Sequence, residues 1–124
     1  MTLQEDFVAA VKAVVFDSAV GGTERLLQDP PGRAPAPALV ALSDWFLSLD
    51  QADRQRVLQV AQISADLATF GMMCVIDGSR RALPDVDHMR LEAVTTNGAR
   101  QEVFDGDYSL HEEYRALVPP FGLE

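Results

Sequence analysis

Residues 57–76 contain a single charged side chain, and this run constrains the fold more than any other part of the chain. Its first half carries apolar residues at helical spacing, and its second half is apolar on every side. Asp50 stands before it as an expected N-cap, with Asp53 in the first turn, where the helix dipole favours negative charge. The sequence therefore predicts a central helix over about residues 51–76, enclosed by the other elements.

The end of this run, residues 70–76, also fits a buried strand, because it is short, ends in Val-Ile and lies among glycines. We favour the helix, since Met, Leu and Ala are good helix formers. Gly71 costs about 1 kcal/mol inside a helix, so we expect another backbone to approach closely there. Gly78 is expected to end the helix in the left-handed conformation.

Two segments before the run also have helical patterns. Residues 3–20 carry an apolar stripe that begins with a Thr2–Glu5 capping box, and Gly21-Gly22 is expected to break or bend this helix. Residues 30–37 form a proline-rich spacer, which favours an extended chain. A second helix is expected after it, with Pro37 at its first position.

Residues 88–105 give the clearest β signal, with an Asn-Gly pair between two alternating segments, as in a hairpin. A two-residue turn pairs Leu91 with Phe104, whereas a bulged three-residue turn sets Glu92 opposite Glu102. We favour the first register because it avoids the like-charge pair. A lone hairpin is marginal in water, so we expect one of its faces to lie on the helices or on another chain.

The C-terminal part predicts one more helix, opened by a Ser109–Glu112 capping box and ended by Pro119-Pro120. The fold class expected is α+β, mainly α, with four to five helices around the central helix (about 51–76) and one β-hairpin (about 88–105). A length of 124 residues is the usual size of one domain, so residues 1–124 are expected to form a single domain.

The chain is acidic: nineteen acidic residues against ten basic ones give a net charge of −9. This charge repels a phosphate backbone and an anionic membrane surface, so neither nucleic acid nor membrane is an expected partner. No uncharged run reaches the roughly 20 residues that span a bilayer, and no signal peptide is visible. The single cysteine, Cys74, excludes an intrachain disulfide and favours a reducing compartment. We therefore expect a cytoplasmic protein.

Motifs for catalysis or cofactor binding are missing from the sequence. It has no glycine-rich phosphate loop and too few cysteines and histidines for a zinc site. Cys74 lies among apolar residues, where a thiol is inert. His88 and His111 are expected at the surface or at the hairpin end. No catalytic residue, cofactor or metal is therefore predicted.

Asp66 is the charged residue inside the central run, and an isolated buried charge is costly. We expect Arg80 or Arg81 to fold back and supply its counter-charge, or the carboxylate to point outward. The alternative function is a small ligand-binding domain or enzyme with one pocket formed by Asp66, Asp77, Arg80 and Arg81. An Asp66 sealed in an ion pair would remove the candidate acid of that pocket.

The leading functional hypothesis is a non-enzymatic protein-protein interaction or regulatory protein that associates with itself as a homodimer. Tryptophan is enriched at binding hot spots, and the hairpin is apolar on both faces in either register. A specific version is an immunity or inhibitor protein whose acidity masks a basic toxin. The candidate interface residues are Trp45, Leu91, Val94, Val103 and Phe104.

Three segments together, PPGRAP (30–35), LVALSDWFLSLDQADR (39–54) and FGMMCVIDGSR (70–80), resemble a group of small, mostly helical bacterial proteins of unassigned function. The resemblance covers residues 29–81. It implies a bacterial cytosolic protein, and it brings no catalytic residue and no substrate.

Overall fold

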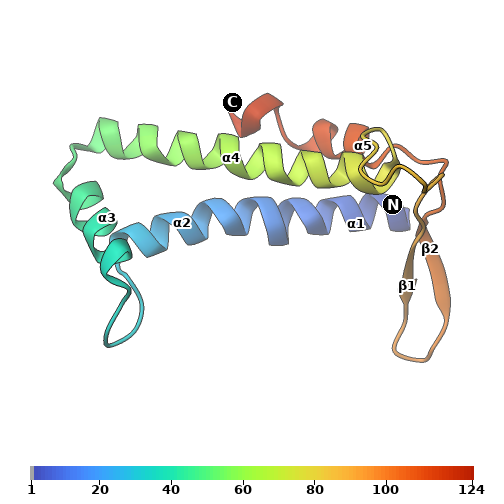
Figure 1. Ribbon diagram of the computed structural model, residues 1–124, viewed down its shortest axis with the longest axis horizontal. Helices are drawn as coiled ribbons and strands as arrows, with labels where there is room; N and C mark the ends of the chain where they lie inside the picture. The colour runs from blue at the N-terminus through green and yellow to red at the C-terminus, as the bar shows by residue number, and fades with distance from the viewer. Residues whose placement is uncertain (1) are drawn as a thin grey trace.

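Two long helices lie side by side and antiparallel in the computed structural model, which describes residues 2–124 (Figure 1). The elements of the first long helix are α1 (Leu3–Val11), the π-helical segment η1 (Lys12–Asp17) and α2 (Ser18–Gln28). The second is α4 (Gln51–Asp77), joined to the first through α3 (Pro37–Ser48). The remaining elements are β1 (Leu91–Val94), β2 (Arg100–Phe104), α5 (Leu110–Leu117) and the 3₁₀ turn η2 (Pro120–Gly122).

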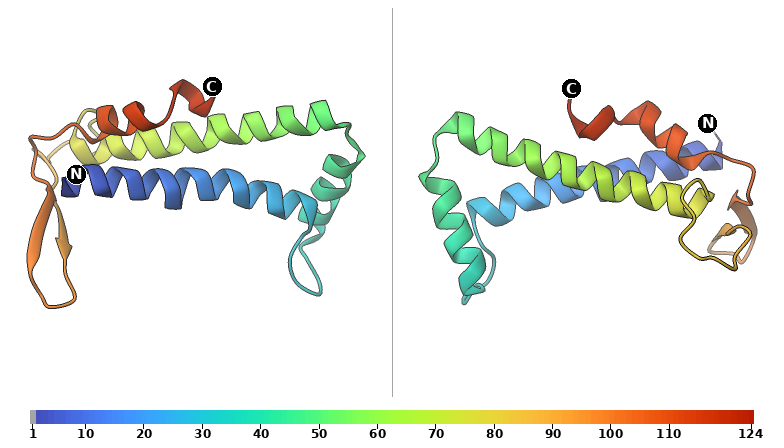
Figure 2. Two further views of the ribbon diagram at one scale, coloured as in Figure 1. Left: turned by 180° about the vertical axis from the view of Figure 1, so that it is seen from behind. Right: turned by 45° about the horizontal axis from the view of Figure 1, so that its top comes forward.

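The two ends of this helix pair carry different projections (Figures 1 and 2). The α3 helix and the loop before it extend away at one end, and the β1–β2 hairpin extends away at the other. The α5 helix and η2 pack along α4. The prediction of an α+β fold, mainly α, with a central helix and one hairpin is confirmed.

The predicted boundaries of α4 are confirmed within one residue, and the strand alternative for residues 70–76 is excluded. Asp50 caps the helix, because its side chain accepts a hydrogen bond from the backbone N–H of Asp53 at 2.8 Å. Gly78 ends the helix with φ of 82°, which an L side chain rarely adopts.

The expectation that neighbours enclose the second half of α4 is wrong. Thr69 and Met73 are buried, but Leu67 and Met72 are 55% and 57% exposed. The first long helix, α5 and η2 cover only part of the α4 surface. An apolar face of α4 is therefore open to water.

The first long helix begins as predicted and continues further than predicted. Both hydrogen bonds of the Thr2–Glu5 capping box are present. Gly21-Gly22 does not break the helix, since both glycines lie inside α2. The cost of a glycine in a helix is about 1 kcal/mol, and packing along α4 offsets a penalty of this size.

The hairpin combines the two predicted registers through a β-bulge. Leu91 pairs with Phe104, as favoured, but beyond the bulge Glu92 stands opposite Glu102. Their repulsion is offset by Arg90, whose guanidinium forms ion pairs with Glu92 at 3.4 Å and with Glu102. The preference for the first register along the whole hairpin was wrong because it left this bridging arginine out.

The hydrophobic core lies where α1, η1, α4, α5 and β2 meet. It holds the base of the hairpin in place, while the tip extends into solvent. The buried members of this core are Val8, Phe16, Met73, Phe104, Leu110, Tyr114 and Val118.

Candidate functional site

Asp66 is completely buried and pairs with Arg115 of α5. Two nitrogen atoms of the guanidinium, Nη1 and Nη2, donate to the two carboxylate oxygens at 2.9 and 3.2 Å. The hydroxyl of Tyr114 donates to the same carboxylate at 3.1 Å. The expectation that Arg80 or Arg81 supplies the counter-charge was therefore wrong.

The surroundings of this ion pair separate Asp66 from solvent. The guanidinium carbon of Arg115 lies 4.4 Å from the ring centre of Phe70. Arg115 Nη1 also donates to the carbonyl of Pro119 at 2.9 Å. Burial, and then the negative charge of Asp66, raise the pKa of Tyr114 far above its ordinary value, so its hydroxyl stays a donor. The carboxylate is sealed, which removes the candidate acid of the enzyme hypothesis.

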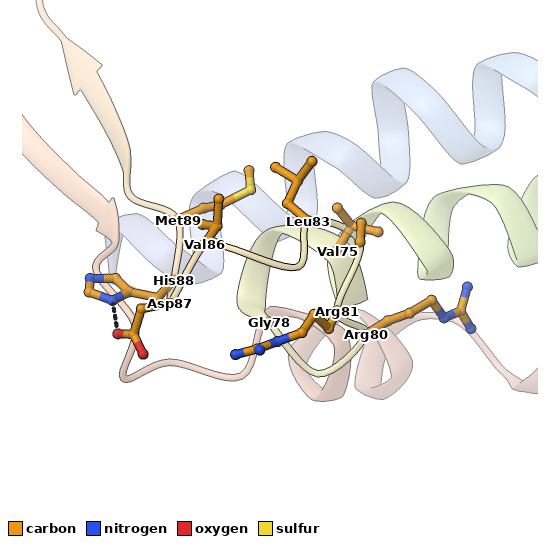
Figure 3. Close-up of a pocket in the computed structure, with 10 residues that line it drawn as sticks. Val75, Gly78, Arg80, Arg81, Leu83, Val86, Asp87, His88 and Met89 are labelled. Atoms are coloured by element: carbon orange, nitrogen blue, oxygen red, sulfur yellow. Dashed lines mark hydrogen bonds and ion pairs between the residues drawn. The ribbon is translucent and has the colours of Figure 1, made fainter.

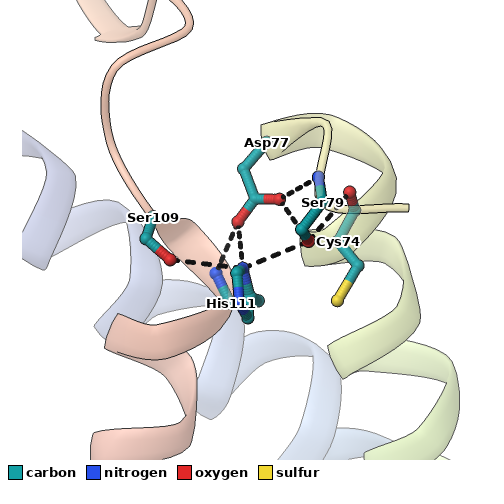
Figure 4. Close-up of polar contacts among 5 residues, drawn as sticks. All are labelled: Cys74, Asp77, Ser79, Ser109 and His111. Atoms are coloured by element: carbon teal, nitrogen blue, oxygen red, sulfur yellow. Dashed lines mark hydrogen bonds and ion pairs between the residues drawn. The ribbon is translucent and has the colours of Figure 1, made fainter. Parts of the chain in front are cut away.

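Asp77 forms a second polar cluster at the end of α4, shown in Figure 4. Its side chain is 2% exposed and accepts hydrogen bonds from the backbone N–H of His111 at 2.9 Å and from the Ser79 hydroxyl at 2.8 Å. Its Oδ2 atom also lies 2.5 Å from His111 Nδ1. Burial raises the pKa of Asp77, but the hydrogen bonds from His111 and Ser79 outweigh it and hold the pKa below its ordinary value.

This cluster explains why the predicted Ser109–Glu112 capping box does not form. Asp77 already accepts from an amide in the first turn of α5, the task an N-cap side chain performs. The Ser109 hydroxyl lies instead 3.2 Å from His111 Nδ1. A residue at the end of one helix thus caps the start of another.

His111 lies in this cluster, 24% exposed, and was not expected there. Ser79 Oγ and Asp77 Oδ2 both contact the same ring nitrogen, Nδ1. A nucleophile–base–acid relay needs the hydroxyl and the carboxylate on opposite ring nitrogens. The arrangement therefore serves to fasten α5 to α4. No local sequence signal links Asp77 and His111, which are 34 positions apart.

Arg80 and Arg81 lie on a different surface, in the small pocket of about 60 Å³ shown in Figure 3. Neither Asp66 nor Asp77 lines this pocket. Arg80 Nη1 lies 3.0 Å from the point that a Cβ of Gly71 would occupy. The group that approaches Gly71 is thus a guanidinium and not the expected backbone. The four residues of the alternative hypothesis do not share one site.

The candidate interface residues divide into two groups. Val103 and Phe104 are 3% and 2% exposed, and Leu91 packs against the core, so the fold of the chain itself uses them. Trp45 on α3 and Val94 on β1 are 50% and 63% exposed. These two elements lie at opposite ends of the molecule (Figure 1). The hairpin and the Trp45 helix therefore do not form one continuous surface.

An apolar groove of about 330 Å³ lies between the first long helix and α4. No charged residue lines it. The sequence did not predict this groove, because its apolar run led us to expect that neighbours enclose α4. The lining residues are Phe7, Val11, Val15, Ala68, Thr69, Met72, Met73 and Ile76.

Comparison with protein-family models, curated proteins and solved structures found no match to this chain. By length and composition alone, α4 is apolar enough to cross a membrane, with a mean hydropathy of 1.3 over eighteen residues, of which 28% are buried. One helix of this kind is weak evidence, because a mostly buried core helix of a soluble protein passes the same test. The resemblance noted from the sequence stays a prediction.

Proposed function

We propose that this chain is a non-enzymatic interaction protein that associates with itself through the open groove. The single observation that supports the proposal is the uncharged groove between α1, η1 and α4, bordered by exposed Val15 and Met72. An open apolar groove without charged residues in its lining is a candidate contact surface. The occupant we assign to it is a second copy of the chain.

The exposed area of the chain supports a second copy. The accessible surface is 8245 Å², whereas a compact monomer of 13.5 kDa exposes about 6,500 Å². The projecting hairpin and α3 account for part of this excess of about 1,700 Å². A stable interface needs about 800 Å² per partner. The excess as a whole is about twice that area, so the extended shape leaves room for such an interface beside the two projections.

The shape of the chain supports the same partner. Two antiparallel helices, covered by α5 on one side and open along an apolar groove, have the arrangement that one half of a four-helix bundle would have. Pairing two such halves would bury both grooves in one core. A lipid surface is a less suitable partner, because an anionic membrane repels a chain with a net charge of −9. We therefore favour the second copy.

Sedimentation velocity over a range of micromolar concentrations tests the proposal. We expect a species of about twice the 13.5 kDa mass of one chain. Met72→Glu, which places a charge at the rim of the groove, should return the protein to a monomer. Val94→Glu is the matched control, because Val94 is as exposed (63%) but lies on the hairpin, and it should leave the dimer unchanged. A monomer for the unmodified chain at every concentration would overturn the proposal.

A further inference from the structure

We infer that the second copy binds through an antiparallel crossing of the two α4 helices, with the two-fold axis at Ala68. This inference rests on the proposed self-association and adds its geometry. In a two-fold interface each patch meets its own counterpart, so the axis passes through the centre of a self-complementary surface. The distribution of charge and of small side chains along α4 locates that centre.

The uncharged surface of α4 is bounded on both sides. Arg56 precedes it and Asp77 follows it, and the one charged residue between them, Asp66, is completely buried against α5. The middle of this interval falls at residues 66–67. Ala68 is the nearest small residue there that is exposed and lines the groove.

The side chains around Ala68 suit a close helix crossing. Ser64 lies one turn before Ala68 on the same face, and both are small and exposed, so the axes of two helices can approach to about 8–10 Å. Met72 lies one turn after Ala68 on the same face, lines the groove and is 57% exposed. In the crossing, Met72 of one copy enters the groove of the other, beside Phe7 and Val11.

The helix dipoles favour the antiparallel direction. Side-chain charge gives no preference, because Asp50 and Asp53 at the start of α4 are balanced by Arg54 and Arg56, and Arg56 pairs with Asp53. An antiparallel crossing sets the N-terminus of each α4 toward the C-terminus of the other, which is the favourable orientation of the two dipoles. A parallel crossing aligns them unfavourably.

Cysteine cross-linking of the full chain, in a Cys74→Ala background, tests the crossing. Ala68→Cys should form a disulfide-linked dimer on oxidation, because the two Cα atoms near the axis can come within about 7 Å. Ser64 lies about 6 Å from Ala68 along the helix. An antiparallel crossing therefore joins Ser64→Cys of one chain to Met72→Cys of a size-tagged second chain. A parallel crossing instead joins position 64 only to position 64, and position 72 only to position 72.

Each variant is also made with Cys74 retained, since Cys74 is buried and the native side chain preserves the core. Linkage at Ala68 together with the mixed Ser64–Met72 product is the expected result. A dimer by sedimentation without these products would overturn the crossing and leave self-association intact. A monomer that floats with phosphatidylcholine vesicles would overturn both and assign the face to lipid.

Discussion

Asp66 of α4 and Arg115 of α5, 49 positions apart in the chain, form an ion pair with two hydrogen bonds. The carboxylate of Asp66 is completely buried, whereas the side chain of Arg115 is 28% exposed. The same arginine stacks on Phe70 and donates to the carbonyl of Pro119. One side chain thus joins α4, α5 and the segment that leads to η2. The pair fastens the C-terminal part of the chain to the long helices.

Removal of Arg115 should be far more damaging than removal of an exposed arginine. Arg115→Leu leaves the buried carboxylate of Asp66 without its counter-charge, and we expect a loss of about 3–5 kcal/mol in the free energy of unfolding. Urea denaturation followed by circular dichroism measures it. Arg81→Leu, at an exposed position, is the control and should change stability by no more than about 0.5 kcal/mol.

The double variant Asp66→Asn/Arg115→Leu separates charge from packing. An amide at position 66 can still accept from the Tyr114 hydroxyl and carries no charge. We therefore expect the double variant to recover much of the stability that Arg115→Leu alone loses. A double variant as unstable as the single one would show that the packing of Arg115, and not its charge, is what matters.

The Asp77 cluster should make stability depend on pH in the acid range. Because the folded-state pKa of Asp77 is held below its ordinary value of 3.8, its contribution is fully present above about pH 4. That contribution is lost as the pH falls through the lower folded-state pKa. Asp77→Asn should cost about 1.5–3 kcal/mol at pH 7, and the difference from the unmodified chain should shrink below pH 4.

Thermal unfolding of both proteins between pH 2.5 and pH 7 checks this dependence. Asp44→Asn is the control, because Asp44 is exposed on α3, and it should follow the unmodified chain at every pH. A difference between Asp77→Asn and the unmodified chain that stays constant down to pH 2.5 would contradict the assigned role of the carboxylate.

Gly122 should tolerate no side chain. Its φ is +70°, and a Cβ there would lie 2.8 Å from the Phe16 ring and 3.0 Å from the carbonyl oxygen of Gln62. We expect Gly122→Ala to lower stability by about 1–3 kcal/mol. Gly98→Ala is the matched control, since Gly98 has a similar φ of +88° but open space around it. Equal losses in the two variants, measured by urea denaturation, would show that the contact with Phe16 adds nothing.

Salt should strengthen the proposed dimer. Each copy carries a net charge of −9, so two copies repel one another at low ionic strength, while the groove that joins them is uncharged. We expect the dimer dissociation constant, measured by sedimentation equilibrium, to fall between 20 mM and 500 mM NaCl. A dissociation constant that rises with salt would indicate that opposite charges hold the copies together.

The start and end of α4 could be read from the sequence because their causes are local. Asp50 caps the helix through an amide three residues away, and Gly78 ends it through its own φ. The Thr2–Glu5 capping box is local in the same sense. The arginine that neutralises Asp66 and the acceptor that caps α5 could not be read in this way, since each depends on which helices become neighbours.

By itself, the sequence determined where the main helices and the hairpin lie and the apolar character of residues 57–76, because backbone preference and capping act within a few residues. Only the tertiary structure decided that Arg115, and not Arg80 or Arg81, reaches Asp66. It also decided that one face of α4 stays open. A helix shows in its sequence how apolar it is, but the side that its neighbours leave uncovered depends on where the rest of the chain packs.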